Sequence, residues 1–177
     1  MKKVLTKFKN LLIYKKEMHK DRRGYLLELF NKKDFKFNVV LNYISCSKKN
    51  TLRGLHFQRK FQQKKLITVL KGEILDVCVD LRKNSKTFGK SFLLTLSDKN
   101  SISLLIPKGF AHGFCVLSNY AIMHYVCSEK RYQEYEECLN WNDKDLKIKW
   151  PNKKFVLSDR DKKGSSFFYF KNNIKTL

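Results

Sequence analysis

The sequence predicts an all-β protein, a β-sandwich or β-barrel with short helical turns around it. Short runs of apolar and β-branched residues recur along the chain, and clusters of Gly, Asn, Asp, Ser and Lys separate them. Inside these runs apolar and polar residues alternate, and the 3.6-residue period of an amphipathic helix is scarce. Because 42% of the 177 residues are hydrophobic, the chain can bury a core. We expect one domain over residues 1–177.

The expected strands follow one another at short intervals from the N-terminus. In chain order they are residues 11–14, 25–30, 39–47, 52–58, 65–70, 73–81, 92–96, 103–106, 110–117 and 121–127. Residues 32–36 are polar and are expected to form a connector. The turn residues Lys71-Gly72 predict a hairpin between the strands on either side, and Ser118-Asn119 predicts a second strand pair.

The C-terminal part contains helical signals instead. Residues 142–146, 150–151 and 158–161 resemble short helical turns that lie over the barrel. The aromatic run 167–170 is expected to add one more strand. Peripheral helices therefore complete the predicted architecture.

The strand at residues 52–58 carries the histidine on which the functional interpretation centres. Leu55 and Phe57 point to one face of this strand, and His56 and Gln58 point to the other. An apolar outer face and a polar inner face are typical of a β-barrel with a polar pocket. The alternative is a histidine on an edge strand that contacts solvent.

The strand at residues 73–81 has the same two-sided pattern. Its odd-numbered residues from 75 to 81 are apolar, whereas Asp76, Cys78 and Asp80 share the opposite face. Carboxylates on that face indicate a polar cavity or solvent.

The formal net charge of +22 permits several interpretations. A basic protein can bind nucleic acid, but the lysines are scattered along the whole chain and no nucleic-acid-binding motif is present. The charge is also compatible with lysines solvated on the surface, and with a field that attracts a phosphorylated substrate. Charge alone does not decide between these possibilities.

The cysteines indicate a reducing compartment. Five cysteines, with no C-x-x-C pair, argue against a disulfide framework or a zinc site. The N-terminus has no apolar signal-peptide core, and no stretch is long enough to span a bilayer. We expect a cytoplasmic protein without membrane contact.

Four histidines limit the possible chemistry. His112 lies between Gly109 and Gly113, where a backbone can approach a ligand closely, whereas His19 and His124 are expected to be solvated or structural. No H-x-H pair or third ligand supports a metal site, and no phosphate-binding or nucleophile motif is present. Acid–base chemistry remains, with candidates that we list together: His56, His112, Lys65, Tyr125, Asp76 and Asp161.

Several of these residues lie in motifs that stand in a recognisable order. The motifs are RGLHFQ (53–58), KLI (65–67), GEILDV (72–77), DLR (80–82), SKTFG (85–89), IPKGFAHGF (106–114), WND (141–143) and LSDRD (157–161). Together they resemble the dTDP-4-dehydrorhamnose 3,5-epimerase family, over about residues 10–161. The resemblance implies a cupin-type jelly-roll β-barrel, a homodimer, and activity without a metal or organic cofactor. It also implies a nucleotide-sugar substrate and a place in dTDP-rhamnose biosynthesis for cell-surface polysaccharide.

The resemblance also implies catalytic roles. His56 would be the base that removes a proton beside the 4-keto group of the sugar, and Asp161 would orient it. Tyr125 would be the acid that returns a proton to the opposite face. Lys65 would stabilise the enolate oxygen, and His112 would bind near the ketone.

Further matching positions would bind the substrate. The resemblance implies that Arg53 and Arg23 hold the diphosphate and that Asp76 holds His112. Glu28 matches a position that contacts the nucleoside and reaches into the partner's site.

The chain also departs from the family pattern. Leu41-Asn42-Tyr43 stands where members usually have Gln-x-Asn, and Lys130 stands where a tyrosine usually stacks on the base. An epimerase acting on one carbon, or on another nucleotide sugar such as a GDP-linked heptose, therefore remains an alternative. A non-catalytic sugar-nucleotide-binding cupin is a rival of another class, although the acid–base set is intact.

Overall fold

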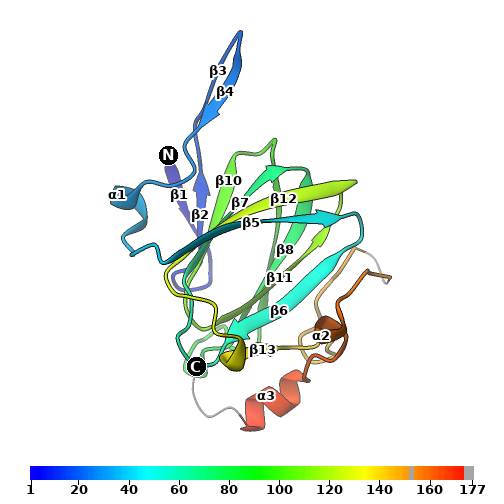
Figure 1. Cartoon of the computed structure of the whole chain (residues 1–177). Coiled ribbons are helices and arrows are strands. Elements are labelled where there is room, and N and C mark those ends of the chain that lie inside the picture. Colours follow the sequence, from blue (N-terminus) through cyan, green and yellow to red (C-terminus); the bar gives the residue numbers. More distant parts are fainter. Residues whose placement is uncertain (152–153, 174–177) are drawn as a thin grey trace.

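Two antiparallel sheets face each other in the computed structural model, which describes residues 1–151 and 154–173 (Figure 1). The first, six-stranded as described, runs in the order β1 (Lys2–Leu5), β2 (Leu12–Lys15), β10 (Ile102–Ile106), β7 (Lys65–Lys71), β12 (Tyr120–Cys127), β5 (Leu41–Lys48). The second, five-stranded over the same residues, runs β13 (Glu136–Cys138), β6 (Leu52–Gln58), β11 (Phe110–Val116), β8 (Glu73–Asp80), β9 (Ser91–Ser97). The all-β prediction is confirmed.

From β5 to β8 and again from β9 to β13, consecutive strands alternate between the two sheets, whereas β1 and β2, and likewise β8 and β9, are paired within one sheet. β7 and β8 lie in different sheets, and so do β11 and β12, so the predicted hairpin at Lys71-Gly72 and the predicted strand pair at Ser118-Asn119 are both wrong. The turn residues signal that the chain reverses, but they do not determine whether the next strand pairs with the last one or crosses to the facing sheet. Crossing lets apolar side chains of both sheets meet in the core between them, as those of β7 and β12 meet those of β8 and β11.

The main core lies between the sheets. Residues from both sheets meet there, including Ile67, Leu104 and Met123 from the first and Ile74 and Phe114 from the second. This core fixes the spacing of the two sheets, and hence the distance between side chains that point inward from either one.

The outer face of the second sheet is covered by the C-terminal segment. Leu55 and Phe57 of β6 pack there, as the alternation predicts, and Phe57 meets Phe170 edge to face at 5.5 Å. Residues 167–170 belong to helix α3 (Phe167–Asn173), so the predicted strand is wrong. Phe167 and Phe170 are buried, whereas the two aromatic residues between them are exposed, which is the three-residue spacing of a helix. A run this short does not distinguish helix from strand in sequence.

The outer face of the first sheet is covered in part by helix α1 (Lys32–Phe35), where the sequence predicted only a connector. Asn31 caps the helix by accepting a hydrogen bond from the Lys33 amide. Phe35 packs against Tyr14 with ring centroids 4.7 Å apart. One helical turn is too short to create a periodic pattern, so the sequence contained little signal for it.

An N-terminal hairpin projects away from both sheets (Figure 1). It consists of β3 (Met18–Asp21) and β4 (Gly24–Leu27), so the strand predicted for residues 25–30 ends at Leu27. Leu26 is 66% exposed, and Tyr25 is exposed beside it. A two-stranded hairpin by itself is marginally stable in water, and the apolar side chains of this one are left uncovered in the single chain.

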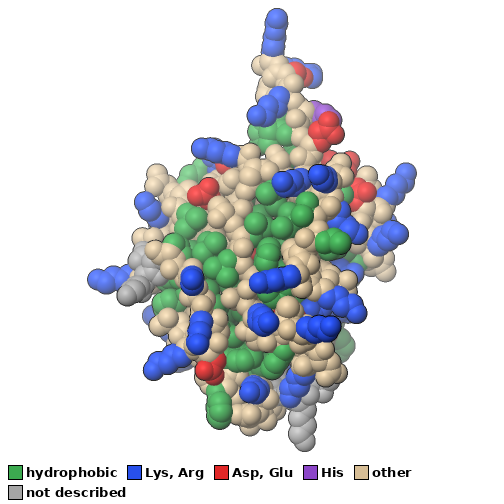
Figure 2. Space-filling view, turned by 180° about the vertical axis from the view of Figure 1, so that it is seen from behind, with side chains coloured by type: hydrophobic (Ala, Val, Ile, Leu, Met, Phe, Trp, Pro, Cys, Tyr) green, Lys and Arg blue, Asp and Glu red, His purple; other side chains and the backbone are tan. Residues whose placement is uncertain are grey.

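The basic side chains are dispersed. On the face shown in Figure 2, Lys and Arg side chains stand among apolar and polar neighbours and do not gather into one stripe. No helix within residues 1–151 and 154–173 is both long and apolar enough to cross a membrane.

Candidate active site

A cavity of about 410 Å³ opens between the two sheets. Five of the predicted site residues line it, namely Arg53, His56, Lys65, His112 and Tyr125. They come from β6 and β11 on one side and from β7 and β12 on the other. The volume lies in the range of small-molecule sites, roughly 300–1,000 Å³.

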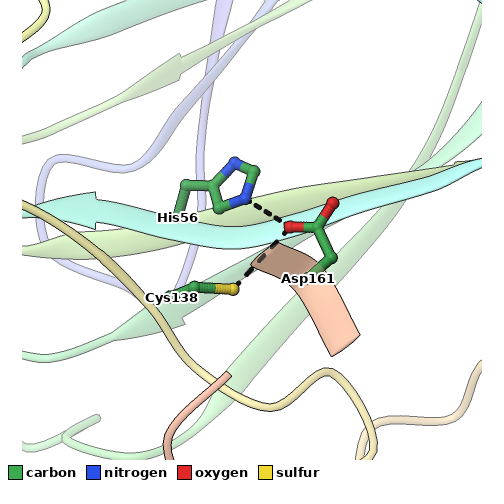
Figure 3. Close-up of side chains that lie close together, drawn as sticks. All are labelled: His56, Cys138 and Asp161. Carbon is green, nitrogen blue, oxygen red and sulfur yellow. Dashed lines mark hydrogen bonds and ion pairs between the residues drawn. The ribbon is translucent and has the colours of Figure 1, made fainter. Parts of the chain in front are cut away.

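His56 is held by Asp161. The Nε2 atom of His56 lies 2.5 Å from Oδ1 of Asp161, which is located in helix α2 (Asp159–Lys162) (Figure 3). The other carboxylate oxygen accepts a hydrogen bond from Ser158 Oγ at 2.8 Å, and the Gly54 amide donates to Oδ1 at 3.3 Å. Burial alone would raise the pKa of Asp161, but these hydrogen bonds outweigh it and hold the pKa below its usual value. Asp161 is therefore a carboxylate, and the hydrogen on His56 lies on Nε2.

Cys138 completes this group. Its Sγ lies 3.7 Å from Oδ1 of Asp161, and in the register of β13 and β6 it is opposite His56 (Figure 3). Burial raises the pKa of the thiol to about 12, so Cys138 is a thiol donor to Asp161. His, Cys and Asp are metal-ligand types, and their ligand atoms lie within 4.8 Å of one another. Two ligands of one zinc ion lie roughly 3 Å or more apart, so the 2.5 Å separation indicates a hydrogen bond.

His112 is held by Asp76. Their Nε2 and Oδ2 atoms are 2.7 Å apart and both side chains are buried. His112 is directly opposite His56 in the register of β11 and β6. The sequence predicted a polar cavity or solvent beside Asp76 and Asp80; both side chains are buried, and the structure places them in different surroundings. Asp76 lies behind His112, whereas Asp80 binds Arg82 and neighbouring hydroxyls outside the cavity.

The glycines near His112 allow strands to approach each other. A Cβ atom on Gly113 would lie 2.7 Å from the Arg53 carbonyl oxygen, and one on Gly54 would lie 2.5 Å from the Gly113 Cα. These two glycines let β6 and β11 come close, which brings the two histidines to the same wall. The expected reason was approach to a ligand, and of the two glycines beside His112 only Gly113 lines the cavity.

Tyr125 and Lys65 line the opposite wall, in the first sheet. Burial raises the pKa of the Tyr125 phenol, which therefore stays protonated. Burial lowers the pKa of the Lys65 ammonium from its usual value of 10.5. The cavity thus has an imidazole on one side and a buried phenol on the other.

Of the residues predicted to bind the substrate, Arg53 lines the cavity, whereas Arg23 and Glu28 do not. Arg53 lines the cavity and donates from Nε to Ser47 Oγ at 2.9 Å. Arg23 lies on the projecting hairpin, where its side chain is 90% exposed and its guanidinium binds Asp21, and Glu28 follows the hairpin. Neither residue lines the cavity of its own chain.

Two charged residues that line the cavity, Arg131 and Glu136, were not predicted from the sequence. Arg131 donates from Nε and Nη2 to Oε2 of Glu136, at 3.1 and 2.9 Å, and Arg160 donates to the same oxygen at 2.6 Å. Burial would raise the pKa of Glu136, but the two arginines lower it. Lys130, which the sequence singled out, is exposed and Arg131 beside it lines the cavity. Alternating charges in this loop are also typical of a solvated surface, so the sequence offered no discriminating signal.

The comparisons with known proteins agree on one family. The family model described as dTDP-4-dehydrorhamnose 3,5-epimerase matches residues 5–168. The chain is 41% identical over 167 residues to the Methanothermobacter thermautotrophicus protein named dTDP-4-dehydrorhamnose 3,5-epimerase, covering 90% of each chain. It is 40% identical to the Shigella flexneri protein of the same name, covering 94% of this chain and 96% of that one.

Two solved structures are similar to this chain. The Legionella pneumophila 3,5-epimerase in complex with dTDP-4-keto-L-rhamnose superposes with a TM-score of 0.91 at 37% identity, covering 93% of this chain and 92% of that one. A 3'-monoepimerase from Streptomyces bikiniensis in complex with dTDP-quinovose superposes with a TM-score of 0.89 at 27% identity, covering 94% and 88%. The chain therefore has the fold of these epimerases, and the prediction of a cupin-type jelly-roll barrel is confirmed.

Proposed function

The chain belongs to the dTDP-4-dehydrorhamnose 3,5-epimerase family and is an isomerase of sugar nucleotides; we propose that it inverts C3 and C5 of dTDP-4-dehydro-6-deoxy-D-glucose, giving dTDP-4-dehydro-L-rhamnose. The observation that carries the proposal is the position of two groups. His56, held by Asp161, and Tyr125 line one cavity from opposite sheets. Inversion at carbon requires proton removal from one face and delivery to the other, so two groups on opposite sides are needed.

His56 is the base in this proposal. Because Nε2 donates to Asp161, the basic lone pair lies on Nδ1. Nδ1 takes the proton from the carbon beside the 4-keto group, and the C–H electron pair moves toward the ketone, forming an enolate. Asp161 balances the charge of the resulting imidazolium, and such a positioned base contributes on the order of 10²–10⁴ in rate.

Lys65 and His112 stabilise the enolate oxygen. The Lys65 ammonium is a cationic donor on one wall, and His112 is fixed by Asp76 on the other. Both are in place before the oxyanion forms, so little reorganisation is needed as charge develops on O4.

Tyr125 then donates its phenolic proton to the opposite face of the same carbon. The enolate electrons form the new C–H bond and the ketone is restored. The phenolate recovers a proton from solvent and His56 releases its proton, so the reaction is an isomerisation without net redox change. The raised pKa of Tyr125 keeps the donor protonated before each turnover.

The proposal extends to a homodimer. Arg23 and Glu28 lie outside the cavity of their own chain, whereas the hairpin beside them projects outward with Leu26 exposed. The hairpin can place these residues against the cavity of a second copy, where Arg23 would join Arg53 at the diphosphate. The five free cysteines support a reducing compartment, so we also place the enzyme in the cytoplasm.

A single-carbon epimerase is the second candidate. The similar Streptomyces bikiniensis protein is a 3'-monoepimerase, and Tyr43 here occupies a cavity position where the family usually has Asn. A cupin without catalysis is disfavoured because the two histidine–carboxylate pairs are intact.

The decisive experiment measures solvent deuterium in dTDP-4-dehydro-6-deoxy-D-glucose by NMR and mass spectrometry. Deuterium at C3 and C5 with inversion at both is expected, and His56→Ala should abolish both signals. Deuterium at one carbon alone identifies the single-carbon enzyme. No exchange with this sugar, but exchange with a GDP-linked 4-keto sugar, would replace the proposed substrate, and exchange retained in His56→Ala would refute the assigned base.

A further inference from the structure

The structure assigns a function to Tyr43: we propose that it is a positioning residue that holds the phenol of Tyr125 in the direction needed for proton delivery. The proposal rests on the function given above, with Tyr125 as the acid. The family resemblance indicated only that Tyr43 stands where members of the family usually have Asn. The geometry shows in addition that Tyr43 packs on the ring of Tyr125.

Tyr43 and Tyr125 form a stacked pair. They are directly opposite each other in the register of β5 and β12. Their ring planes are inclined by 9° and their centroids are 4.6 Å apart. Both line the cavity, so the Tyr43 ring covers one face of the Tyr125 ring inside the site. Stacking at this distance restricts rotation of the covered ring.

The Tyr125 hydroxyl is weakly held by hydrogen bonds. Within the described part of the chain its contacts are Ser45 Oγ at 3.5 Å and Met123 Sδ at 3.4 Å. Hydroxyl hydrogen bonds to oxygen normally measure about 2.7–2.8 Å, so the Ser45 contact is long, and a thioether is a weak acceptor. Hydrogen bonding therefore does not fix the direction of the phenol, and ring packing must do so.

The rest of the strand supports this assignment. Leu41, Tyr43 and Ser45 alternate on the cavity side of β5. Tyr43 is 39% exposed, so one side of its ring faces Tyr125 while the remainder contributes to the cavity wall. Burial is the main cause that raises the pKa of the Tyr43 phenol; of the two charged residues that line the cavity with it, Arg131 lowers this pKa and Glu136 raises it. An asparagine or an aliphatic side chain at position 43 could not stack on Tyr125.

The test separates proton abstraction from inversion. In a variant with a misplaced Tyr125, His56 still removes the proton and returns a solvent-derived one to the original face. The recovered substrate then gains deuterium without inversion. We therefore expect Tyr43→Leu to lower the inversion rate on the order of 10-fold or more, while exchange into recovered substrate is retained. Tyr43→Phe retains the ring and should behave as wild type.

Matched controls make the result specific. Tyr120→Leu removes a tyrosine of similar exposure, 44%, from β12 outside the cavity, and should leave both rates unchanged. Tyr43→Met replaces Tyr43→Leu if the latter fails to fold in a thermal melt. Equal loss of exchange and inversion, no loss in the aliphatic variants, or a loss in Tyr43→Phe equal to that in Tyr43→Leu would each overturn the proposal. Failure of the proposed function would differ, because wild type itself would then show no exchange.

Discussion

Oδ1 of Asp161, in the four-residue helix α2, lies 2.5 Å from Nε2 of His56 in strand β6. Since Ser158 and the Gly54 amide also bind this carboxylate, its position is fixed before substrate arrives. The hydrogen bond joins two residues that are distant in the sequence into one pair at the cavity.

Replacing Asp161 by Asn should lower kcat by about 10²–10⁴ with a smaller change in KM. The amide removes the charge that stabilises the imidazolium and permits the wrong tautomer of His56. Steady-state kinetics on the 4-keto substrate would measure the effect. Asp159→Asn alters an exposed carboxylate in the same helix and should leave kcat unchanged; similar values for both variants would contradict the assignment.

Lys65→Met should lower kcat and raise the free energy of unfolding. Losing the donor at the enolate oxygen should cost about 10²–10³ in kcat. The pKa of Lys65 is lowered in the folded protein, so the charged form is less favourable there than in the unfolded chain. The resulting penalty applies at neutral pH and disappears as pH rises through the lowered pKa toward 10.5.

Urea denaturation would measure this second effect. Lys65→Met should raise the free energy of unfolding at pH 7 by about 1 kcal/mol, and its advantage should shrink at alkaline pH. Lys71→Met, an exposed change in the same strand, is the control. A variant that is less stable than wild type at pH 7 would show that Lys65 supports the fold.

Much of the architecture and part of the site were predictable from sequence. Period-two alternation identified the strand of His56 and the correct faces for Leu55 and Phe57, because one-sided burial leaves a strong local pattern. The pairing of strands was not predictable. Turn residues such as Lys71-Gly72 are the same for a hairpin and for a crossing between sheets.

The contacts that depend on register were also hidden. Tyr43 meets Tyr125 because of how β5 and β12 align, and His112 meets His56 because of how β11 and β6 align. Nothing local to either residue encodes such a pairing. Arg131 lies in a charged loop that, in sequence, is indistinguishable from solvated surface.

Asp80→Asn should destabilise the protein without affecting the cavity. The buried carboxylate accepts from Arg82 Nε and Nη2 at 2.8 and 2.7 Å, and from Ser85 and Thr87 at 2.6 Å each. Burial alone would raise the pKa of Asp80, but these hydrogen bonds hold it below its usual value. Its contribution to stability is therefore present above the unfolded pKa, about 3.9, and is lost as pH falls through the lower folded pKa.

Asp80→Asn should lower the free energy of unfolding by about 3 kcal/mol at pH 7, and this difference should diminish in acid. Denaturation at pH 7 and pH 3 would show this, with Asp145→Asn, an exposed carboxylate, as the control. A loss that is independent of pH would mean that shape, and not charge, is important at this position.

The hairpin of β3 and β4 provides the test of the dimer. Leu26 is 66% exposed in the single chain, and a charge there disturbs no buried contact of its own chain. If the hairpin packs on a second copy, Leu26→Glu places an unpaired carboxylate in that interface and should weaken association by at least about 10-fold. Light scattering and activity should both decline on dilution, and activity should recover at high protein concentration because the missing Arg23 and Glu28 return with the partner.

Val156→Glu is the control. It alters a similarly exposed apolar side chain, 63% exposed, in another part of the chain and should change neither association nor activity. A wild-type monomer with full activity would instead require Arg53 to bind the diphosphate without the hairpin.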